Sequence, residues 1–174
     1  MALNAASGLP TRNFREGIFE GAEKISGQTM RDTVLVERGG CYACPIRCKR
    51  VTKASGEFGP EPVYGGPEYE TIGSLGSCCG VDDLEAICRG NEICNAYGLD
   101  TISAGVTIAF AMECFENGVL TLKDTDGIEL RFGNGDAMVK ILRKIAMREG
   151  IGDLLAEGTV RAAQAIGKGA AQFA

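Results

Sequence analysis

The sequence predicts a mostly α, multi-helical protein with antiparallel helix packing and a Gly/Pro-rich loop that binds a metal cluster. Apolar residues recur with a helical period in successive segments of the chain. Short polar residues precede these segments and single glycines follow them, as expected for helices joined by tight turns. Between two of the segments, residues 41–48 contain three cysteines.

The first expected helix begins at Asn13, which makes a capping-box pair with Glu16, and it ends at Gly27. The residues of its apolar face are Phe14, Ile18, Ala22 and Ile25. Residues 33–38 are a short β-branched run that predicts a strand or an extended approach to the cysteines. Residues 55–67 are dense in Gly and Pro, so they predict an exposed connection without regular structure.

The next expected helix begins at Asp82, in a capping box with Glu85, and ends at Gly98. Its buried stripe is Leu84, Ile87, Cys88 and Tyr97. A further helix starts at once, capped by Asp100 or Thr101 and closed by Asn117-Gly118. Its apolar residues are Ile102, Val106, Ala109, Phe110, Met112 and Phe115. Because they cover much of its circumference, this helix should lie in the centre of the core.

The last third of the chain predicts more helices after a polar, turn-rich seam over residues 119–135. Asp136 should cap a helix that Gly150 ends. Its apolar positions are Met138, Ile141, Leu142 and Ile145. Residues 153–166 predict one further helix or a pair of helices, ending near Gly167.

Composition excludes several classes of function. The net charge is −5 with no basic run, which argues against a nucleic-acid surface. There is no apolar stretch of about 20 residues, so no membrane span is expected. The chain contains no His, so acid–base chemistry must use carboxylates, Tyr, Lys or Cys. Eight cysteines without a signal-peptide pattern favour a reducing, cytoplasmic location.

The most informative motif is Cys41-x-x-Cys44-Pro45-x-x-Cys48. Thiolates at this spacing can converge on one iron–sulfur cluster if the backbone turns tightly through them, so these three cysteines are the predicted metal ligands. A zinc ribbon would need a second Cys-x-x-Cys knuckle, and none follows. The candidates for a fourth ligand are a residue beyond 174 or one of the five other cysteines, Cys78, Cys79, Cys88, Cys94 and Cys114. Each of these five could instead be a small buried hydrophobic residue, and that interpretation is favoured for Cys88, Cys94 and Cys114.

Several stretches, taken in order, give the chain a resemblance to the tungsten-containing aldehyde ferredoxin oxidoreductases. They are Leu9-Pro10-Thr11-Arg12-Asn13-Phe14, the cysteine motif, Gly66-Pro67-Glu68-Tyr69-Glu70-Thr71, Asn95-Ala96-Tyr97-Gly98-Leu99-Asp100-Thr101-Ile102-Ser103, and residues 148–158. Members of this family are roughly three times longer. The resemblance therefore implies a fragment whose missing domains include a β-rich one, and whose isolated chain is inactive.

The resemblance also implies roles for matching residues. Cys41, Cys44 and Cys48 would ligate a [4Fe-4S] cluster whose fourth Cys lies downstream of this chain. The pterin-contacting motif of a tungsten or molybdenum bis-pterin would be Asn95, Gly98, Leu99 and Asp100, although Asp100 also suits a helix N-cap. Glu70 would be the catalytic carboxylate near the metal, although a solvated acid in a first helical turn is the plainer reading.

The implied activity is oxidation of aldehydes to acids, with electrons passing through the cluster to ferredoxin. Three alternatives stay open: the catalytic subunit of an aromatic-ring-reducing complex on the same scaffold, a stand-alone iron–sulfur carrier, and a zinc module. Residues 1–8 are expected to be a leader, 9–118 a helical iron–sulfur-binding domain, and 119–174 a helical extension toward the next domain. Apolar faces exposed by missing domains could also form a homo-oligomer.

Overall fold

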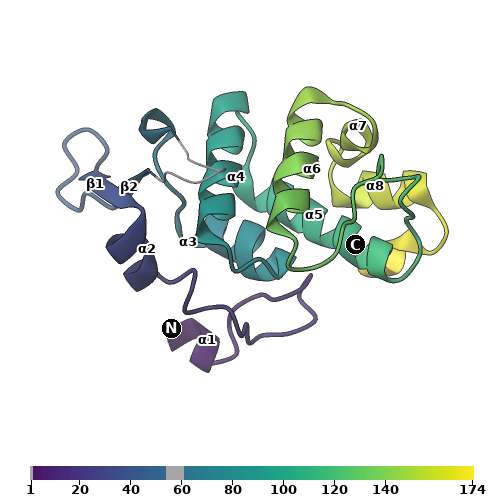
Figure 1. The fold of residues 1–174 in the computed structure, drawn as a ribbon, viewed down its shortest axis with the longest axis horizontal. Coiled ribbons are helices and arrows are strands. Elements are labelled where there is room, and N and C mark those ends of the chain that lie inside the picture. The colour runs from purple at the N-terminus through teal and green to yellow at the C-terminus, as the bar shows by residue number, and fades with distance from the viewer. Residues whose placement is uncertain (1, 54–60) are drawn as a thin grey trace.

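The computed structural model describes residues 2–53 and 61–174 (Figure 1). Within them lie eight α-helices and one small antiparallel sheet, so the predicted mostly α fold is confirmed. The α-helices are α1 (Ala2–Ala5), α2 (Gly27–Thr33), α3 (Tyr69–Thr71), α4 (Leu84–Tyr97), α5 (Thr101–Glu116), α6 (Gly135–Met147), α7 (Ile151–Leu155) and α8 (Thr159–Ile166). The strands are β1 (Leu35–Gly39) and β2 (Lys49–Thr52).

The hydrophobic core is built around α5, α4 and α6. Helices α4 and α6 lie side by side in Figure 1, and α5 packs on both. Ile108, Phe110 and Met112 of α5 are fully buried, which confirms the prediction that this helix occupies the centre. Two residues expected to be apolar core positions, Ile102 of α5 and Tyr97 of α4, are instead exposed, because each lies in an end turn of its helix. Buried residues on both sides of residue 118 belong to one cluster. The domain limits at residues 8 and 118 stay predictions.

The junction between α4 and α5 follows the prediction. Gly98 ends α4 in the left-handed region, with φ 70°, where glycine has no steric penalty. Asp100 caps α5, because its Oδ2 accepts a hydrogen bond from the Ser103 amide at 2.7 Å. A single turn thus joins the two longest helices.

Three other caps differ from the expected residues by one or two positions. Asp83 rather than Asp82 caps α4, through hydrogen bonds from the amides of residues 85 and 86. Asn134 rather than Asp136 caps α6, and Arg148 in the left-handed region, rather than Gly150, ends it. The helices α7 and α8 are the pair expected over residues 153–166.

The amphipathic helix predicted from Asn13 is wrong. Residues 12–26 form successive turns, and Gly27 begins α2 instead of ending a helix. Phe14 and Ile18, two of the four expected core positions, are 65% and 55% exposed, whereas Ala22 and Ile25 are buried.

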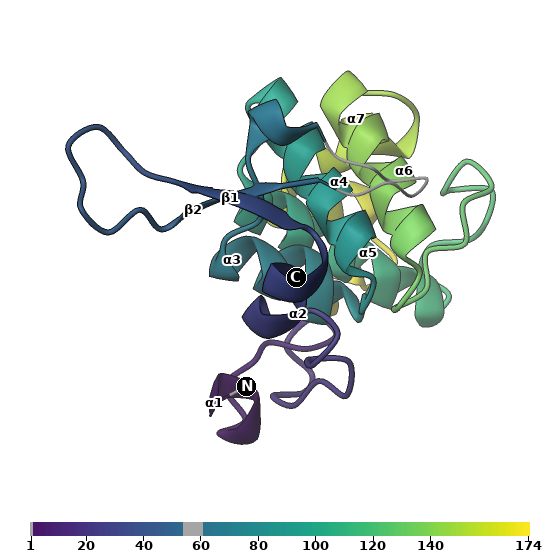
Figure 2. The same cartoon turned by 60° about the vertical axis from the view of Figure 1, so that its left-hand side comes forward.

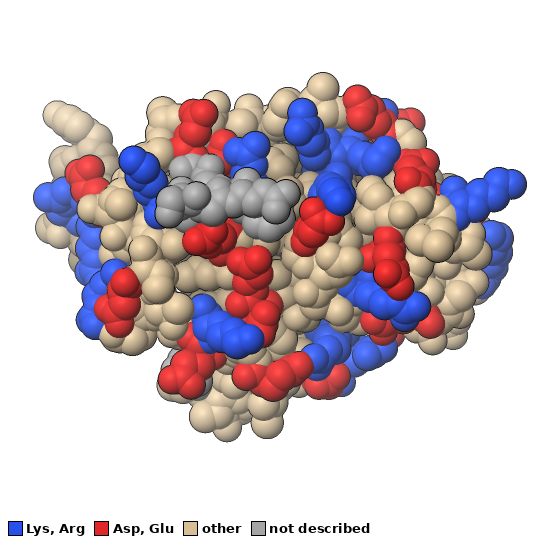
Figure 3. All heavy atoms as spheres, viewed as in Figure 1, with Lys and Arg blue, Asp and Glu red and all other residues tan. Residues whose placement is uncertain are grey.

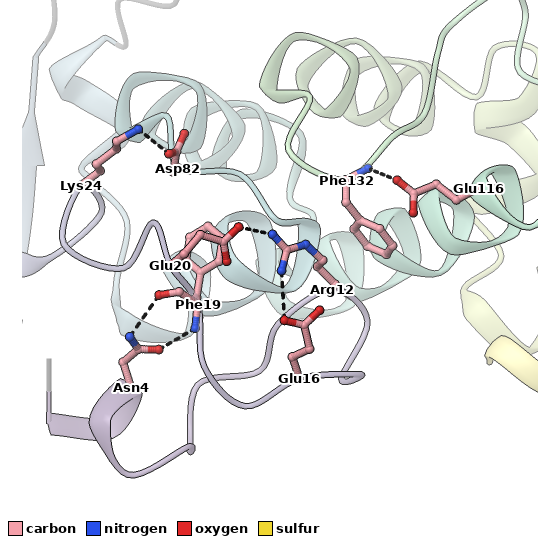
Figure 4. Close-up of polar contacts among 9 residues, drawn as sticks. All are labelled: Asn4, Arg12, Glu16, Phe19, Glu20, Lys24, Asp82, Glu116 and Phe132. Atoms are coloured by element: carbon pink, nitrogen blue, oxygen red, sulfur yellow. Dashed lines mark hydrogen bonds and ion pairs between the residues drawn. The ribbon is translucent and has the colours of Figure 1, made fainter.

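Tertiary contacts explain why this segment is not helical. Arg12, Asn13 and Phe14 all have positive φ, so a right-handed helix cannot start there. The Arg12 amide instead donates to the Ser77 carbonyl at 3.0 Å, and the guanidinium of Arg12 pairs with Glu16 and Glu20 (Figure 4). These contacts override a helical period that two internal glycines already weaken.

Residues 2–8 also contact the rest of the molecule. The Asn4 side chain donates to the Phe19 carbonyl at 3.0 Å and accepts from the Phe19 amide at 2.7 Å (Figure 4). The loop of residues 12–26 is further fixed to the helical body by an ion pair between Lys24 and Asp82. The N-terminal segment is therefore held by polar contacts at two separate points.

The cysteine motif lies on a β-hairpin. Of the strand or extended approach expected over residues 33–38, residues 35–38 lie in β1, whereas Thr33 ends α2. Strand β1 pairs with β2, a strand that the sequence did not indicate. The loop over residues 40–48 projects away from the helices (Figure 2). Of the expected irregular connection over residues 55–67, Pro62–Tyr64 forms a single 3-10 turn, and residues 54–60 lie outside the described residues.

An irregular helical segment carries Glu70. Helix α3 continues into a π-helical turn (Ile72–Gly76) and a 3-10 turn (Ser77–Cys79). This segment packs very closely on α5, since a Cβ placed on Gly105 would lie 2.6 Å from the carbonyl carbon of Ser74. The absence of a side chain at Gly105 therefore sets the distance between α5 and the segment that follows Glu70.

Surface charges do not form a patch of one sign on the face shown in Figure 3, where acidic and basic side chains are interspersed. The described ranges contain no helix that is both long enough and apolar enough to cross a bilayer.

Candidate functional site

The three predicted cluster ligands share the hairpin loop. Cys41 and Cys48 are exposed and Cys44 is partly exposed. The Cys44 amide donates to the Cys41 carbonyl at 3.0 Å, which closes a tight turn between the first two thiols. Ala43 and Arg47, the residues just before Cys44 and Cys48, both have positive φ, as expected for a backbone that reverses within the motif.

The structure separates these three thiols from the other five. Burial raises the pKa of Cys78, Cys88 and Cys114 to about 11 and that of Cys94 to about 12. Burial also raises the pKa of Cys79, with a smaller contribution from the neighbouring Cys78. All five therefore remain neutral thiols near neutral pH, and the thiolate is the form that binds metal.

The three loop cysteines do not yet converge. Within residues 2–53 and 61–174, no three Cys, Asp or Glu side chains are grouped closely enough to hold a metal ion. All three thiols nevertheless belong to one loop between paired strands, and none lies on a separate rigid element.

A cavity of about 680 Å³ lies beside the hairpin, where its two strands enter the loop. The ends of β1 and β2, the 3-10 turn before α3, α3 itself and one face of α4 form its walls. Its polar lining includes Arg50, Glu70, Thr71, Asn91, Asn95 and Thr101. The volume lies within the range of small-molecule and cofactor pockets.

Two predicted site residues meet in this cavity. Glu70 and Asn95 both line it, although they come from α3 and α4. Asn95 donates from Nδ2 to the Tyr64 carbonyl at 2.9 Å, which ties the 3-10 turn to α4. The hydroxyls of Thr71 and Thr101 lie 2.9 Å apart and join α3 to the first turn of α5. These contacts fix the walls from which Glu70 and Asn95 face the cavity.

The other predicted pterin contacts lie elsewhere. Leu99 and Asp100 line a separate cavity of about 100 Å³, smaller than typical ligand pockets. The Ser103 side chain and amide lower the pKa of Asp100, so its carboxylate is ionised and engaged as a helix cap. A Cβ on Gly98 would meet no atom within 4 Å, so a ligand could approach the backbone there.

One residue of the cavity was not suggested by any motif. Asn91, which precedes Asn95 by one helical turn, is only 4% exposed. Its Nδ2 has no hydrogen-bond partner among the described residues. The neighbouring Glu92 is 7% exposed but is paired with Arg89 at 2.6 Å and accepts from the Glu61 amide at 3.1 Å. The sequence offers no signal for Asn91, because an Asn in a helical stripe is usually satisfied locally.

Comparisons with known proteins identify the family of the chain. A family model described as aldehyde ferredoxin oxidoreductase, domains 2 and 3, matches residues 1–174. The tungsten-containing aldehyde ferredoxin oxidoreductase of Thermococcus kodakarensis is 44% identical over 169 residues, which cover 95% of this chain and 27% of that protein. The enzyme of the same description from Pyrococcus furiosus is 41% identical, with the same coverage.

A solved structure is also similar. It is the active site complex BamBC of benzoyl coenzyme A reductase, with a TM-score of 0.69 and 32% identity over 84% of this chain and 21% of that one. The chain thus spans about a quarter of the length of the curated relatives it matches. With the family model matching its whole length and three of its cysteines together on one exposed loop beside a polar cavity, this chain belongs to the aldehyde ferredoxin oxidoreductase family.

Proposed function

We propose that this chain is the part of a tungstopterin oxidoreductase that holds a [4Fe-4S] cluster and forms one wall of the pterin site. The complete protein would oxidise aldehydes to acids and pass the electrons to ferredoxin. The observation that carries this proposal is the accessible triad of Cys41, Cys44 and Cys48 on a hairpin whose strands line a 680 Å³ cavity where they enter the loop. Glu70 and Asn95 lie in that same cavity.

The residues present fit both groups. Three accessible thiols on one loop are a suitable donor set for three irons, and a fourth ligand would come from outside this chain. The cavity offers amide, hydroxyl and carboxylate side chains, and its wall contains a buried amide donor that lacks a partner. When bound, the pterin metal supplies two-electron oxidation and the cluster carries the electrons away.

Glu70 is the proposed proton acceptor of the site. Its side chain is exposed to the cavity, and the Thr71–Thr101 contact directly after it fixes the end of α3. A carboxylate held in this way can accept the proton released when an aldehyde becomes an acid. Asn95 and the open backbone at Gly98 would orient the pterin.

The proposed partners are ferredoxin and further domains of the same protein. Exposed Tyr42 and Ile46 on the hairpin tip and Phe14 near α5 are apolar surfaces that such domains would cover. A cytoplasmic location suits a chain whose eight cysteines are all free thiols.

The alternative of an aromatic-ring-reducing enzyme is less well supported. The relatives named as tungsten aldehyde oxidoreductases are 41–44% identical, whereas the benzoyl coenzyme A reductase complex is 32% identical. A stand-alone carrier or zinc module fits poorly with a chain that matches part of much longer proteins.

Anaerobic reconstitution with iron and sulfide tests the cluster. The complete protein should bind about four irons per chain with a brown chromophore, and the chromophore should be lost in Cys44→Ser. Cys114→Ser is the matched control, because that thiol is buried and the chromophore should persist. Tight stoichiometric zinc with no iron uptake would contradict the proposal.

Substrate assays test the chemistry. The tungsten-loaded complete protein should reduce ferredoxin with an aldehyde, and Glu70→Gln should lower kcat by about 100-fold or more, as expected for loss of a general base. Reduction of an aromatic thioester without any aldehyde oxidation would instead establish the alternative.

A further inference from the structure

The wall that α4 contributes to the large cavity contains one unexplained polar group. Asn91 is 4% exposed, and its Nδ2 has no hydrogen-bond partner within residues 2–53 and 61–174. It is the single buried side-chain nitrogen or oxygen in those ranges for which this is true. Buried amides in folded proteins are almost always hydrogen-bonded, so an exception points to a missing partner.

The residues on either side of Asn91 do not share this deficit. Glu92 is buried to a similar degree and has two partners, Arg89 and the Glu61 amide. Asn95, one turn later on the same face of α4, donates to the Tyr64 carbonyl. The unsatisfied amide is therefore specific to Asn91 and is not a general property of this face.

The position of Asn91 indicates where the missing partner lies. Asn91 lines the same cavity as Asn95, Glu70, Thr71 and Thr101. A carboxamide presents a donor and an acceptor side by side, and rotation by 180° exchanges them. It can thus make two parallel hydrogen bonds to a planar group that carries an acceptor beside a donor.

We propose that Asn91 is a positioning residue of the pterin site, whose carboxamide hydrogen-bonds the polar edge of the pterin ring. This rests on the proposed function, because the pterin is the planar ligand whose amino, ring N–H and carbonyl groups alternate along one edge. Asn91 and Asn95, one turn apart on α4, would then orient the ring from the α4 wall of the cavity.

The proposal predicts effects of opposite sign on stability and on ligand retention. In the 174-residue chain without ligand, Asn91→Leu removes an unsatisfied donor and keeps the number and branching of the side-chain heavy atoms. Its Tm should equal that of the wild type or exceed it by up to about 4 °C. In the complete protein, the same substitution should weaken pterin retention about tenfold, the loss expected for one to two hydrogen bonds.

The measurements are thermal unfolding by circular dichroism and pterin per chain after anaerobic gel filtration, read by fluorescence of the oxidised pterin. Asn117→Leu is the matched control, because Asn117 is exposed at the far end of α5 and bonds only the Glu113 carbonyl. It should leave the pterin content at the wild-type value.

Either of two results would overturn the assignment of Asn91. A Tm of the Asn91→Leu chain clearly below wild type would show that the amide is already satisfied. Unchanged pterin content in the complete variant would show that the pterin does not use it, and continued aldehyde oxidation there would leave the proposed function intact. If instead the wild type contains pterin but oxidises no aldehyde, the proposed function fails while loss of pterin in the variant still supports Asn91.

Discussion

The close contact between α5 and the π-helical turn gives a quantitative prediction for Gly105→Ala. A Cβ at this position would lie 2.6 Å from the carbonyl carbon of Ser74, 2.7 Å from its Cβ and 2.8 Å from its carbonyl oxygen. Two of these three atoms belong to the backbone, so no side-chain rotation relieves the clash. Helix α5 and the segment that follows Glu70 would have to separate.

The magnitude follows from two opposing effects. Replacing a glycine inside a helix by alanine stabilises the helix by about 0.5–1 kcal/mol. Overpacking against a fixed neighbour costs about 1–3 kcal/mol. Because two of the clashing atoms are backbone, the cost should lie in the upper part of that range, about 2–2.5 kcal/mol, so the free energy of unfolding should fall by about 1–2 kcal/mol. For a chain of this length that corresponds to a Tm lowered by about 2–8 °C.

Thermal and urea unfolding of the 174-residue chain measure the effect, with Gly27→Ala as the matched control. Gly27 also lies in a helix, but a Cβ there meets no atom within 4 Å. The control should be unchanged or slightly more stable. A Gly105→Ala chain as stable as wild type or more so would refute the idea that this contact fixes the spacing of the two segments.

Two further predictions follow from the thiols and from the cap of α5. A thiol-reactive dye should label Cys41, Cys44 and Cys48 rapidly in the native chain, and all eight cysteines only after denaturation. The other five thiols react slowly because they are buried and their pKa values are raised. Rapid labelling of more than three cysteines would contradict the burial. Asp100→Ala should cost about 0.5–2 kcal/mol, whereas Asp100→Asn should be nearly neutral at pH 7. The Ser103 contacts lower the pKa of Asp100 in the folded chain. The stabilisation by its carboxylate is therefore present above about pH 3.9 and is lost as pH falls through the folded pKa. Asp100→Asn should remove this part of the pH dependence of unfolding, and an unchanged pH profile would argue against the capping carboxylate.

The sequence predicted the elements whose signals are local. The turn at Gly98 and the cap at Asp100 depend on residues within one helical turn, and both are confirmed. The buried helix α5 also followed directly from its apolar circumference. Helices of this kind need no information from distant parts of the chain.

The features that the sequence did not predict depend on distant contacts. The helical period after Asn13 was overridden because backbone groups of residues 12 and 13 bond to the Ser77 and Cys78 carbonyls. For the site, the motifs named Glu70 and Asn95, which share a cavity. Asn91 lines the same cavity, but it stands out only in the folded chain, where its buried amide has no hydrogen-bond partner among the described residues.

The hairpin that carries the thiols has only two short strands, and a ribbon of that kind is marginally stable by itself. One of its rungs even places Arg38 opposite Arg50, two like charges. Metal capture by the loop would therefore add to the free energy that orders the ribbon. Substitutions along the rungs should then shift iron affinity, and such positions offer a means of tuning cluster assembly without altering a ligand.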